Sequence, residues 1–281
     1  MFSGQGAQKV GMGREFYDNP AYKAAFDEAS TALGFDLANI CQNDNDKLNQ
    51  TAYAQPALLT AGIASYRMLG ERPDILMGLS LGEYTALCAA EAISLHDAVR
   101  LVHKRGLLMQ EHGAGGMMAC IMERGQVVNI VEGFPNVYCA NFNAPDQVVI
   151  SGDKDALTLC AKEVKAQGGK ALPLKVQGGF HSPLMAAAAA AFAEVLNTVD
   201  FNKPTIPIIS NVNADIIGDI KDTLVKHMTS PVKWEESVNK AISLGHKSFI
   251  ELGYGNVLVK LATKINNNIQ ALSFEEYYGQ N

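Results

Sequence analysis

The stretch Gly78-Leu79-Ser80-Leu81-Gly82 constrains the fold of this chain more than any other part of the sequence. It follows a short apolar run, Ile75-Leu76-Met77, and precedes a helix-forming run from Glu83 to Ala92. Small residues two positions before and two positions after a serine allow a sharp turn between a strand and a helix, with the helix N-terminus behind the hydroxyl. The context favours this turn over a chance match of common residues. The Ser80 hydroxyl is then placed to act as a nucleophile.

Composition and charge describe an ordinary globular protein. The chain has 281 residues, of which 48% are hydrophobic and 19% charged, and its net charge is -6. An acidic chain argues against a nucleic-acid surface, for which a basic excess is expected. No signal segment opens the chain and no apolar stretch reaches bilayer length, so we expect no membrane contact. The cysteines are odd in number and lack metal-ligand spacing, which favours reduced thiols and a cytoplasmic location: Cys41, Cys88, Cys120, Cys139 and Cys160.

Apolar periodicity predicts helices that alternate with short strands over most of the chain. Helices are expected around residues 14–32, 55–69, 83–92, 95–111, 154–167, 183–198, 219–228, 234–243 and 255–266. Strands are expected at residues 75–77, 117–122, 137–141, 147–151, 171–176, 206–210 and 248–251. This alternation predicts an α/β fold with a largely parallel sheet.

The middle of the chain departs from this rhythm. Gly113 to Gly116 loosens the chain and is followed by strand, helix, strand, strand, helix and strand before Gly178-Gly179. This is the element order of a ferredoxin-like unit. We therefore predict a small domain at residues 115–176, inserted into a larger α/β domain formed by residues 1–114 and 177–281.

A serine nucleophile needs a base within hydrogen-bond reach, and His181 is the best placed of six histidines. It lies in a glycine-loosened loop, Gln177-Gly178-Gly179-Phe180-His181, that leads into a helix, so its side chain can project into a cleft. The others lie on predicted helices or beside charged residues. A surface or core role is the alternative for His181, and position alone does not decide between the two.

Arg105 is unusual because it lies on an apolar helix face. Ala98, Val102, Arg105 and Met109 share one side of the predicted helix. A guanidinium there needs an anionic partner, and its planar fork fits a carboxylate with two bonds. An internal Asp or Glu and the carboxylate of a substrate are the two candidates.

The N-terminal run Gly4-Gln5-Gly6-Ala7-Gln8 offers backbone N–H groups with little steric cover. Such groups can hold an oxyanion, although a plain loop is the simpler interpretation. The glycine spacing does not fit a dinucleotide or P-loop fingerprint, so nucleotide binding is excluded.

Five segments together resemble the malonyl-CoA:acyl carrier protein transacylases of fatty acid synthesis and their polyketide acyltransferase relatives. They run in order across nearly the whole chain: Phe2-Ser3-Gly4-Gln5-Gly6-Ala7-Gln8, Gly78-Leu79-Ser80-Leu81-Gly82-Glu83-Tyr84, Lys104-Arg105-Gly106, Gly179-Phe180-His181-Ser182 and Glu251-Leu252-Gly253. The resemblance implies an α/β-hydrolase-like domain with a ferredoxin-like insert.

The resemblance also implies a role for each matching residue. Ser80 is the acylated nucleophile, His181 is its base, and Arg105 binds the malonyl carboxylate. The backbone N–H groups of Gln5 and Leu81 form the oxyanion hole. The remaining implied positions support the site: the backbone carbonyl of His227, where relatives usually have glutamine, then Asn143, Asn211, Met109, and Phe180, whose bulk resembles malonyl-selective members.

Three departures from the family pattern stand out. Leu79 replaces a frequent histidine, which affects acyl selectivity, and Tyr254 and Asn256 interrupt a run that usually reads glycine, proline, glycine, lysine. Relatives also have several more residues before the position of Met1. We therefore expect a truncated or unusually short first strand and a weakened seat for Gln5.

The resemblance implies a two-step transfer from malonyl-CoA to acyl carrier protein through a malonyl-serine, without metal or tightly bound cofactor. We expect a monomer that docks the acidic carrier protein through cationic residues, for which Lys154, Lys162, Lys165, Lys170 and Lys175 are candidates and a solvated face is the alternative. Three rivals remain: a free-standing polyketide acyltransferase, a hydrolase of acyl carrier protein thioesters, and a degenerate docking module without activity.

Overall fold

The chain mixes helices with short strands, as the apolar periodicity predicts, although α1 to α4 follow one another before the first strand. The computed structural model describes residues 1–280. The larger part contains strands β1 (Leu76–Met77), β6 (Ile208–Ile209), β7 (Ser248–Glu251) and β8 (Gln270–Ser273), and helices α1 (Pro20–Leu33), α2 (Leu37–Asn43), α3 (Asn45–Leu48), α4 (Thr51–Leu69), α5 (Leu81–Ala89), α6 (Leu95–Glu111), α9 (Ala186–Asn197), α10 (Ile220–Thr229), α11 (Trp234–Ser243), α12 (Val257–Ile265) and α13 (Phe274–Tyr278). Short 3-10 turns lie at Arg14–Phe16 and Pro183–Met185. Within residues 1–280, no helix combines the length and the apolar character that a membrane crossing requires.

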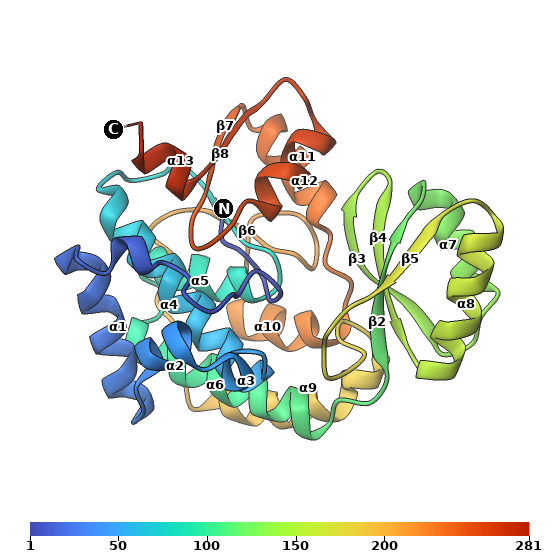
Figure 1. Cartoon of the computed structure of the whole chain (residues 1–281), viewed down its shortest axis with the longest axis horizontal. Helices are drawn as coiled ribbons and strands as arrows, with labels where there is room; N and C mark the ends of the chain where they lie inside the picture. Colours follow the sequence, from blue (N-terminus) through green and yellow to red (C-terminus); the bar gives the residue numbers. More distant parts are fainter. Residues whose placement is uncertain (281) are drawn as a thin grey trace.

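The sheet that carries the serine turn is parallel and is assembled from short pieces. β1 pairs with β6 and β7 pairs with β8, both in parallel register. Phe2 joins the two pairs, because it forms parallel bridges with Gly78 and with Leu252. The first strand is thus reduced to one bridging residue at the centre of the sheet. Around it, helices cover the sheet (Figure 1), which confirms the predicted α/β class.

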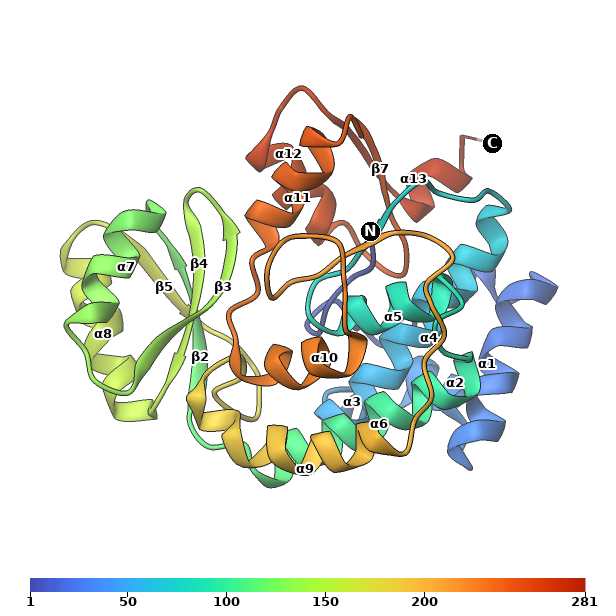
Figure 2. The ribbon, with the colours of Figure 1, turned by 180° about the vertical axis from the view of Figure 1, so that it is seen from behind.

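The middle of the chain forms a second, antiparallel sheet. Its elements are β2 (Gly116–Ile121), α7 (Arg124–Glu132), β3 (Val137–Ala144), β4 (Gln147–Gly152), α8 (Lys154–Ala166) and β5 (Lys170–Pro173), in the sheet order β3-β4-β2-β5. This order and the two helices make it ferredoxin-like. Figures 1 and 2 show α7 and α8 on the face that points away from the larger part. The strand order confirms the predicted ferredoxin-like fold, whereas the boundaries at residues 115 and 176 stay a prediction.

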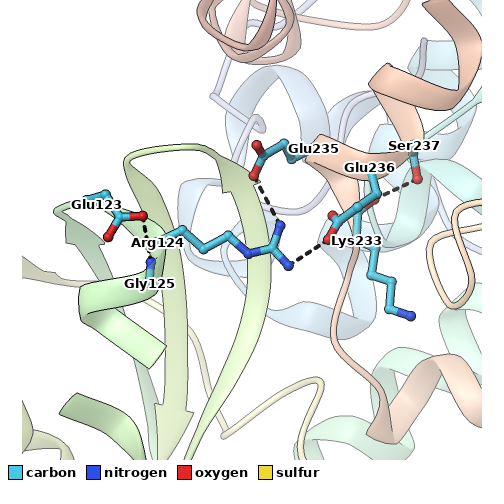
Figure 3. A network of polar contacts seen from close by, with 7 residues as sticks. All are labelled: Glu123, Arg124, Gly125, Lys233, Glu235, Glu236 and Ser237. Atoms are coloured by element: carbon cyan, nitrogen blue, oxygen red, sulfur yellow. Dashed lines mark hydrogen bonds and ion pairs between the residues drawn. The ribbon is translucent and has the colours of Figure 1, made fainter. Parts of the chain in front are cut away.

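A charged contact joins the two parts at the start of α11. Arg124, the first residue of α7, lies 3.2 Å from Glu235 and 2.6 Å from Glu236 (Figure 3). The same guanidinium lies 4.0 Å from the ring centroid of Phe142 on β3. The backbone N–H of Phe142 also donates to the carbonyl of Val232 at 2.9 Å, so the junction combines ionic, cation–π and main-chain contacts.

The first helix begins later than predicted. It starts at Pro20 because Asn19 caps it, accepting hydrogen bonds from the N–H groups of Ala21 and Tyr22, and proline suits the first helical position. Residues 14–16 form only a 3-10 turn after Gly13, whose φ is 68°. The short helices α2, α3 and α13 are absent from the predicted helix ranges.

We expect Arg124→Ala to lower the free energy of unfolding by about 1 kcal/mol, because the change removes two ion pairs and a cation–π contact at a partly exposed junction. Lys23→Ala is the matched control, since it breaks one exposed pair with Asp27 within α1. Urea unfolding measures both variants. Equal losses would show that the junction contributes no more than an ordinary surface pair.

Candidate active site

Ser80 lies at a strained turn between β1 and α5. Its φ and ψ are 53° and -103°, a conformation that non-glycine residues seldom adopt. Gly78 and Gly82 make the turn possible, because a Cβ on Gly78 would overlap the backbone of Gly82, and one on Gly82 would overlap the carbonyl of Phe2. The backbone therefore presents the hydroxyl at the start of a helix, as the glycine spacing predicts.

The structure brings Ser80 and His181 together across 101 residues of sequence. The Ser80 Oγ lies 2.8 Å from Nε2 of His181. The other ring nitrogen, Nδ1, lies 2.9 Å from the carbonyl oxygen of His227, which can only accept a hydrogen bond. This contact places the imidazole proton on Nδ1 and leaves Nε2 free to accept the serine proton. The arrangement has the geometry that a nucleophile, its base and a group that orients the base require.

The environment keeps His181 neutral. Its side chain is buried, and burial together with the positive charge of Arg105 lowers the pKa of His181 to about 4. The ring of His227 packs beside it with centroids 5.1 Å apart, and burial lowers the pKa of His227 well below its ordinary value. Both rings are therefore uncharged near neutral pH, the form in which His181 can act as a base.

Arg105 is a buried guanidinium with unused donors. Only 1% of the residue is exposed, and Nη1 donates to Oε1 of Gln55 at 2.9 Å. Its Nε and Nη2 have no hydrogen-bond partner within residues 1–280, and no carboxylate of that range forms an ion pair with it. Glu83 is an internal carboxyl group that interacts with Arg105 electrostatically, but it forms neither a hydrogen bond nor an ion pair with it within residues 1–280. The guanidinium lies 5.0 Å from the ring centroid of Tyr84 on α5, the helix that follows the serine turn.

Close packing of α4 and α6 sets the position of Arg105. A Cβ on Gly106 would lie 2.6 Å from the Cα of Ala52, so only glycine lets the helices approach this closely. Pro56 lacks an N–H, and the carbonyl of Ala52 four residues earlier instead accepts a hydrogen bond from Nδ1 of His103 at 2.8 Å. This contact brings Gln55 within reach of Arg105.

Two backbone N–H groups near Ser80 remain without acceptors. Neither Gln5 nor Leu81 donates its N–H to any group of residues 1–280. The loop that carries Gln5 is held on both sides: Ser3 Oγ donates to Glu251 at 2.9 Å, and Gln5 Nε2 donates to Thr51 at 3.1 Å. The expected weakening of the seat of Gln5 is not observed.

A cavity of about 240 Å³ lies between the two parts of the molecule and contains the serine and the histidine. Its walls include Ser80, His181, Gln5, Phe180, Met109 and Asn143 from the predicted site, and Met117, Ala119 and Val149 from the ferredoxin-like sheet. The Oδ1 of Asn143 has no partner within residues 1–280. A larger hollow of about 820 Å³ near residues 200–221 contains none of these groups.

Four predicted site residues are not among those that line the cavity: Leu81, Arg105, Asn211 and His227. Asn211 is fully buried. Asn211, which the resemblance implied as a supporting residue, bonds to the backbone of the serine turn. Sequence reasoning also gave no role to Gln55, whose signal was a polar residue beside Pro56 on an apolar helix.

Comparisons with known proteins agree on one family. The model of the acyl transferase domain matches residues 1–275. A malonyl CoA-acyl carrier protein transacylase of Bacillus subtilis is 42% identical over 98% of this chain and 92% of its own length. A polyketide biosynthesis malonyl CoA-acyl carrier protein transacylase of the same species is 39% identical over 97% of this chain and 98% of its own length.

Solved structures agree in fold. The malonyl CoA-acyl carrier protein transacylase of Coxiella burnetii has a TM-score of 0.95 at 35% identity, covering 99% of this chain and 95% of its own. A malonyl-transacylase in complex with a type II polyketide acyl-carrier protein has a TM-score of 0.94 at 37% identity, covering 97% and 94%.

We expect the reaction of Ser80 with phenylmethanesulfonyl fluoride to proceed nearly as fast at about pH 5.5 as at about pH 7.5, because an imidazole with a pKa of about 4 stays neutral at both. An ordinary imidazole would be about nine-tenths protonated at the lower pH and lose about tenfold in rate. Mass spectrometry gives the rates, circular dichroism confirms folding, and Glu83→Gln controls for a nearby carboxyl whose pKa burial raises to about 7. A tenfold fall in both proteins would contradict a depressed pKa.

Proposed function

The chain belongs to the acyl transferase domain family, and from this premise we propose that it transfers malonyl groups from malonyl-CoA to the phosphopantetheine thiol of acyl carrier protein. We assign the reaction to fatty acid synthesis, with a polyketide pathway as the second candidate, since one similar relative is named for polyketide biosynthesis. The observation that carries the proposal is the hydrogen-bonded series from Ser80 through His181 to the His227 carbonyl, next to a buried Arg105 with two free N–H groups.

In the first half-reaction, Ser80 takes the malonyl group. Nε2 of His181 accepts the serine proton while Oγ bonds to the thioester carbon. The negative oxygen of the tetrahedral intermediate lies at the free N–H groups of Gln5 and Leu81. When the intermediate collapses, the carbon–sulfur bond breaks and the protonated His181 returns its proton to the leaving sulfur of coenzyme A. A malonyl ester on Ser80 remains.

In the second half-reaction, the same groups work in reverse. The thiol of the carrier protein gives its proton to His181 and its sulfur attacks the ester carbon. Collapse breaks the bond between the carbon and Oγ, and His181 returns the proton to the serine oxygen. Two thioesters are exchanged, so the reaction is nearly balanced, and the site must keep water away from the ester. Apolar walls of Phe180 and Met109 suit that task.

Arg105 selects the free carboxylate of malonyl. Its Nε and Nη2 can donate two parallel hydrogen bonds, the geometry in which a guanidinium binds a carboxylate. Burial strengthens this attraction, because water screens it little. An acyl group without a carboxylate leaves these donors unpaired, which disfavours acetyl and similar groups.

The carrier protein approaches from the open side of the cavity. Of the exposed candidate lysines for its acidic surface, Lys170 and Lys175 lie on β5 and just after it, beside the cavity-lining Leu174 and Val176, whereas Lys154, Lys162 and Lys165 lie on α8, on the sheet face that points away from the cavity. Charge of this kind raises association rates more than affinity. The five cysteines are free thiols, as expected for a protein of the cytoplasm, and we propose that the chain acts there as a monomer.

Ser80→Ala should abolish the mass increase that malonyl-CoA produces on the wild-type chain, because no hydroxyl is left to form the ester. Intact-protein mass spectrometry after brief mixing gives the result. Released malonate and malonyl-carrier protein are then measured for the wild type. Persistent labelling of the variant would refute the role of Ser80, and malonate as the main product would indicate a hydrolase.

Arg105→Ala should lower kcat/KM for malonyl-CoA by roughly a hundredfold, because two charge-assisted hydrogen bonds are lost. Transfer of acetyl from acetyl-CoA should fall far less, or rise, since acetyl has no carboxylate. Steady-state rates with one carrier protein compare the two donors. Equal losses for both would assign Arg105 a purely structural role.

A further inference from the structure

Asn211 bonds to both sides of the serine turn. Its Oδ1 accepts a hydrogen bond from the N–H of Ser80 at 2.6 Å, and its Nδ2 donates to the carbonyl of Gly78 at 2.7 Å. The residue is fully buried and follows β6, the strand that pairs with β1. The Asn211 amide therefore bridges the backbone on both sides of Ser80, the residue whose φ is 53°. We call these two hydrogen bonds of Asn211 the clamp.

Glu83 holds Asn211 in turn. Its Oε2 accepts a hydrogen bond from the backbone N–H of Asn211 at 2.7 Å. Glu83 is fully buried on the first turn of α5, and its Oε1 has no partner within residues 1–280. Burying a carboxyl group is unfavourable unless hydrogen bonds or nearby charges compensate, and the bond from the Asn211 N–H is one such contact. A side chain of α5, the helix that follows Ser80, thus holds the residue that bonds to the Ser80 turn.

The hydrogen bonds at the start of α5 leave one backbone N–H group free. The N–H of Gly82 donates to the Leu79 carbonyl at 3.0 Å, and that of Glu83 donates to the Ser80 carbonyl at 3.1 Å. Asn211 occupies the N–H of Ser80. The N–H of Leu81 is the one that remains, and it is the donor assigned to the oxyanion.

We propose that Glu83 is a positioning residue for the nucleophile: through the backbone of Asn211 it holds the amide that fixes the turn at Ser80 and leaves the Leu81 N–H for the oxyanion. This inference deepens the proposed function, because it rests on Ser80 as the acylated group. Glu83 is not among the residues that line the cavity, and its hydrogen bond to Asn211 is the route by which we propose that it acts on the turn.

A second role for Glu83 must be separated from this one. The positive charge of Arg105 interacts with the Glu83 carboxylate, so Glu83 also offsets part of the Arg105 charge. A role through Arg105 would affect malonyl and spare acyl groups without a carboxylate. A role through the turn affects every reagent that reacts with Ser80, which distinguishes the two.

The experiment measures the rate of Ser80 modification in the full chain with three reagents: malonyl-CoA, acetyl-CoA and phenylmethanesulfonyl fluoride. Glu83→Ala removes the acceptor, and Glu83→Gln is its matched control, because the amide oxygen can still accept from the Asn211 N–H. We expect Glu83→Ala to react about 10- to 100-fold more slowly with all three reagents, since small displacements of a reacting group have effects of this size. Glu83→Gln should stay within about threefold of the wild type, and KM for malonyl-CoA should change little in either variant.

Asn211→Ala is the second variant, and it should match Glu83→Ala in its loss with all three reagents. It decides the matter if thermal unfolding shows that Glu83→Ala does not fold. Wild-type rates with the sulfonyl fluoride in a folded Glu83→Ala or Asn211→Ala protein would overturn the proposal. A loss confined to malonyl-CoA, or a Glu83→Gln loss as large as that of Glu83→Ala, would overturn it as well.

The sulfonyl fluoride separates this inference from the proposed function. If malonyl-CoA fails to label wild-type Ser80 while the sulfonyl fluoride does, the proposed function is wrong. The comparison of variants with the sulfonyl fluoride still tests the clamp in that case.

Discussion

The strained turn at Ser80 depends on backbone packing directly against backbone, and most of the site follows from that packing. Gly78, Gly82 and Gly4 have no side chain, so β1, α5 and the N-terminal loop approach more closely than any Cβ would allow. A residue in this conformation costs about 1–3 kcal/mol, which the surrounding core must offset. The same approach brings the loop that carries Gln5 to the start of the helix that carries Leu81. One steric condition therefore exposes the nucleophile and assembles the groups around it.

Burial gives the charged and titratable groups of the site their chemical character. Arg105, Glu83, His181 and His227 are all at most 5% exposed, an arrangement that lowers stability unless other contacts compensate. Burial makes both imidazoles neutral and raises the pKa of Glu83 to about 7, while an arginine stays charged. The site thus places a neutral imidazole beside a permanent cation with two unpaired nitrogens. The anionic acyl group that we propose as its ligand pairs with these nitrogens.

The local motifs were predictable from sequence, and the resemblance paired Ser80 with His181, but the contacts behind the serine turn were not predicted. The glycine spacing around Ser80 and the element order of residues 115–176 are local patterns, so they led to the turn and the ferredoxin-like sheet. The contacts of Asn211 with Ser80 and Gly78 join segments more than 130 residues apart, which no periodicity records. The helix expected from residue 14 failed for a local reason, because the cap at Asn19 outweighed an apolar pattern that extends further back. The resemblance named the same residues but could not say that Asn211 lies behind the serine.

The position of the cavity explains why the ferredoxin-like sheet has helices on one face only. Met117, Ala119 and Val149 on its other face form a wall of the cavity opposite the serine turn. A helix there would fill the space that an acyl group needs. The two parts must then keep a fixed distance. Ion pairs cross between them: Arg124 pairs with α11, and Asp146 pairs with Lys264 on α12. These pairs lie near β3, the edge strand of the sheet, and near the turn between β3 and β4. In the function we propose, the serine side supplies the chemistry, and the ferredoxin-like sheet, positioned by those contacts, determines how much room the acyl group has.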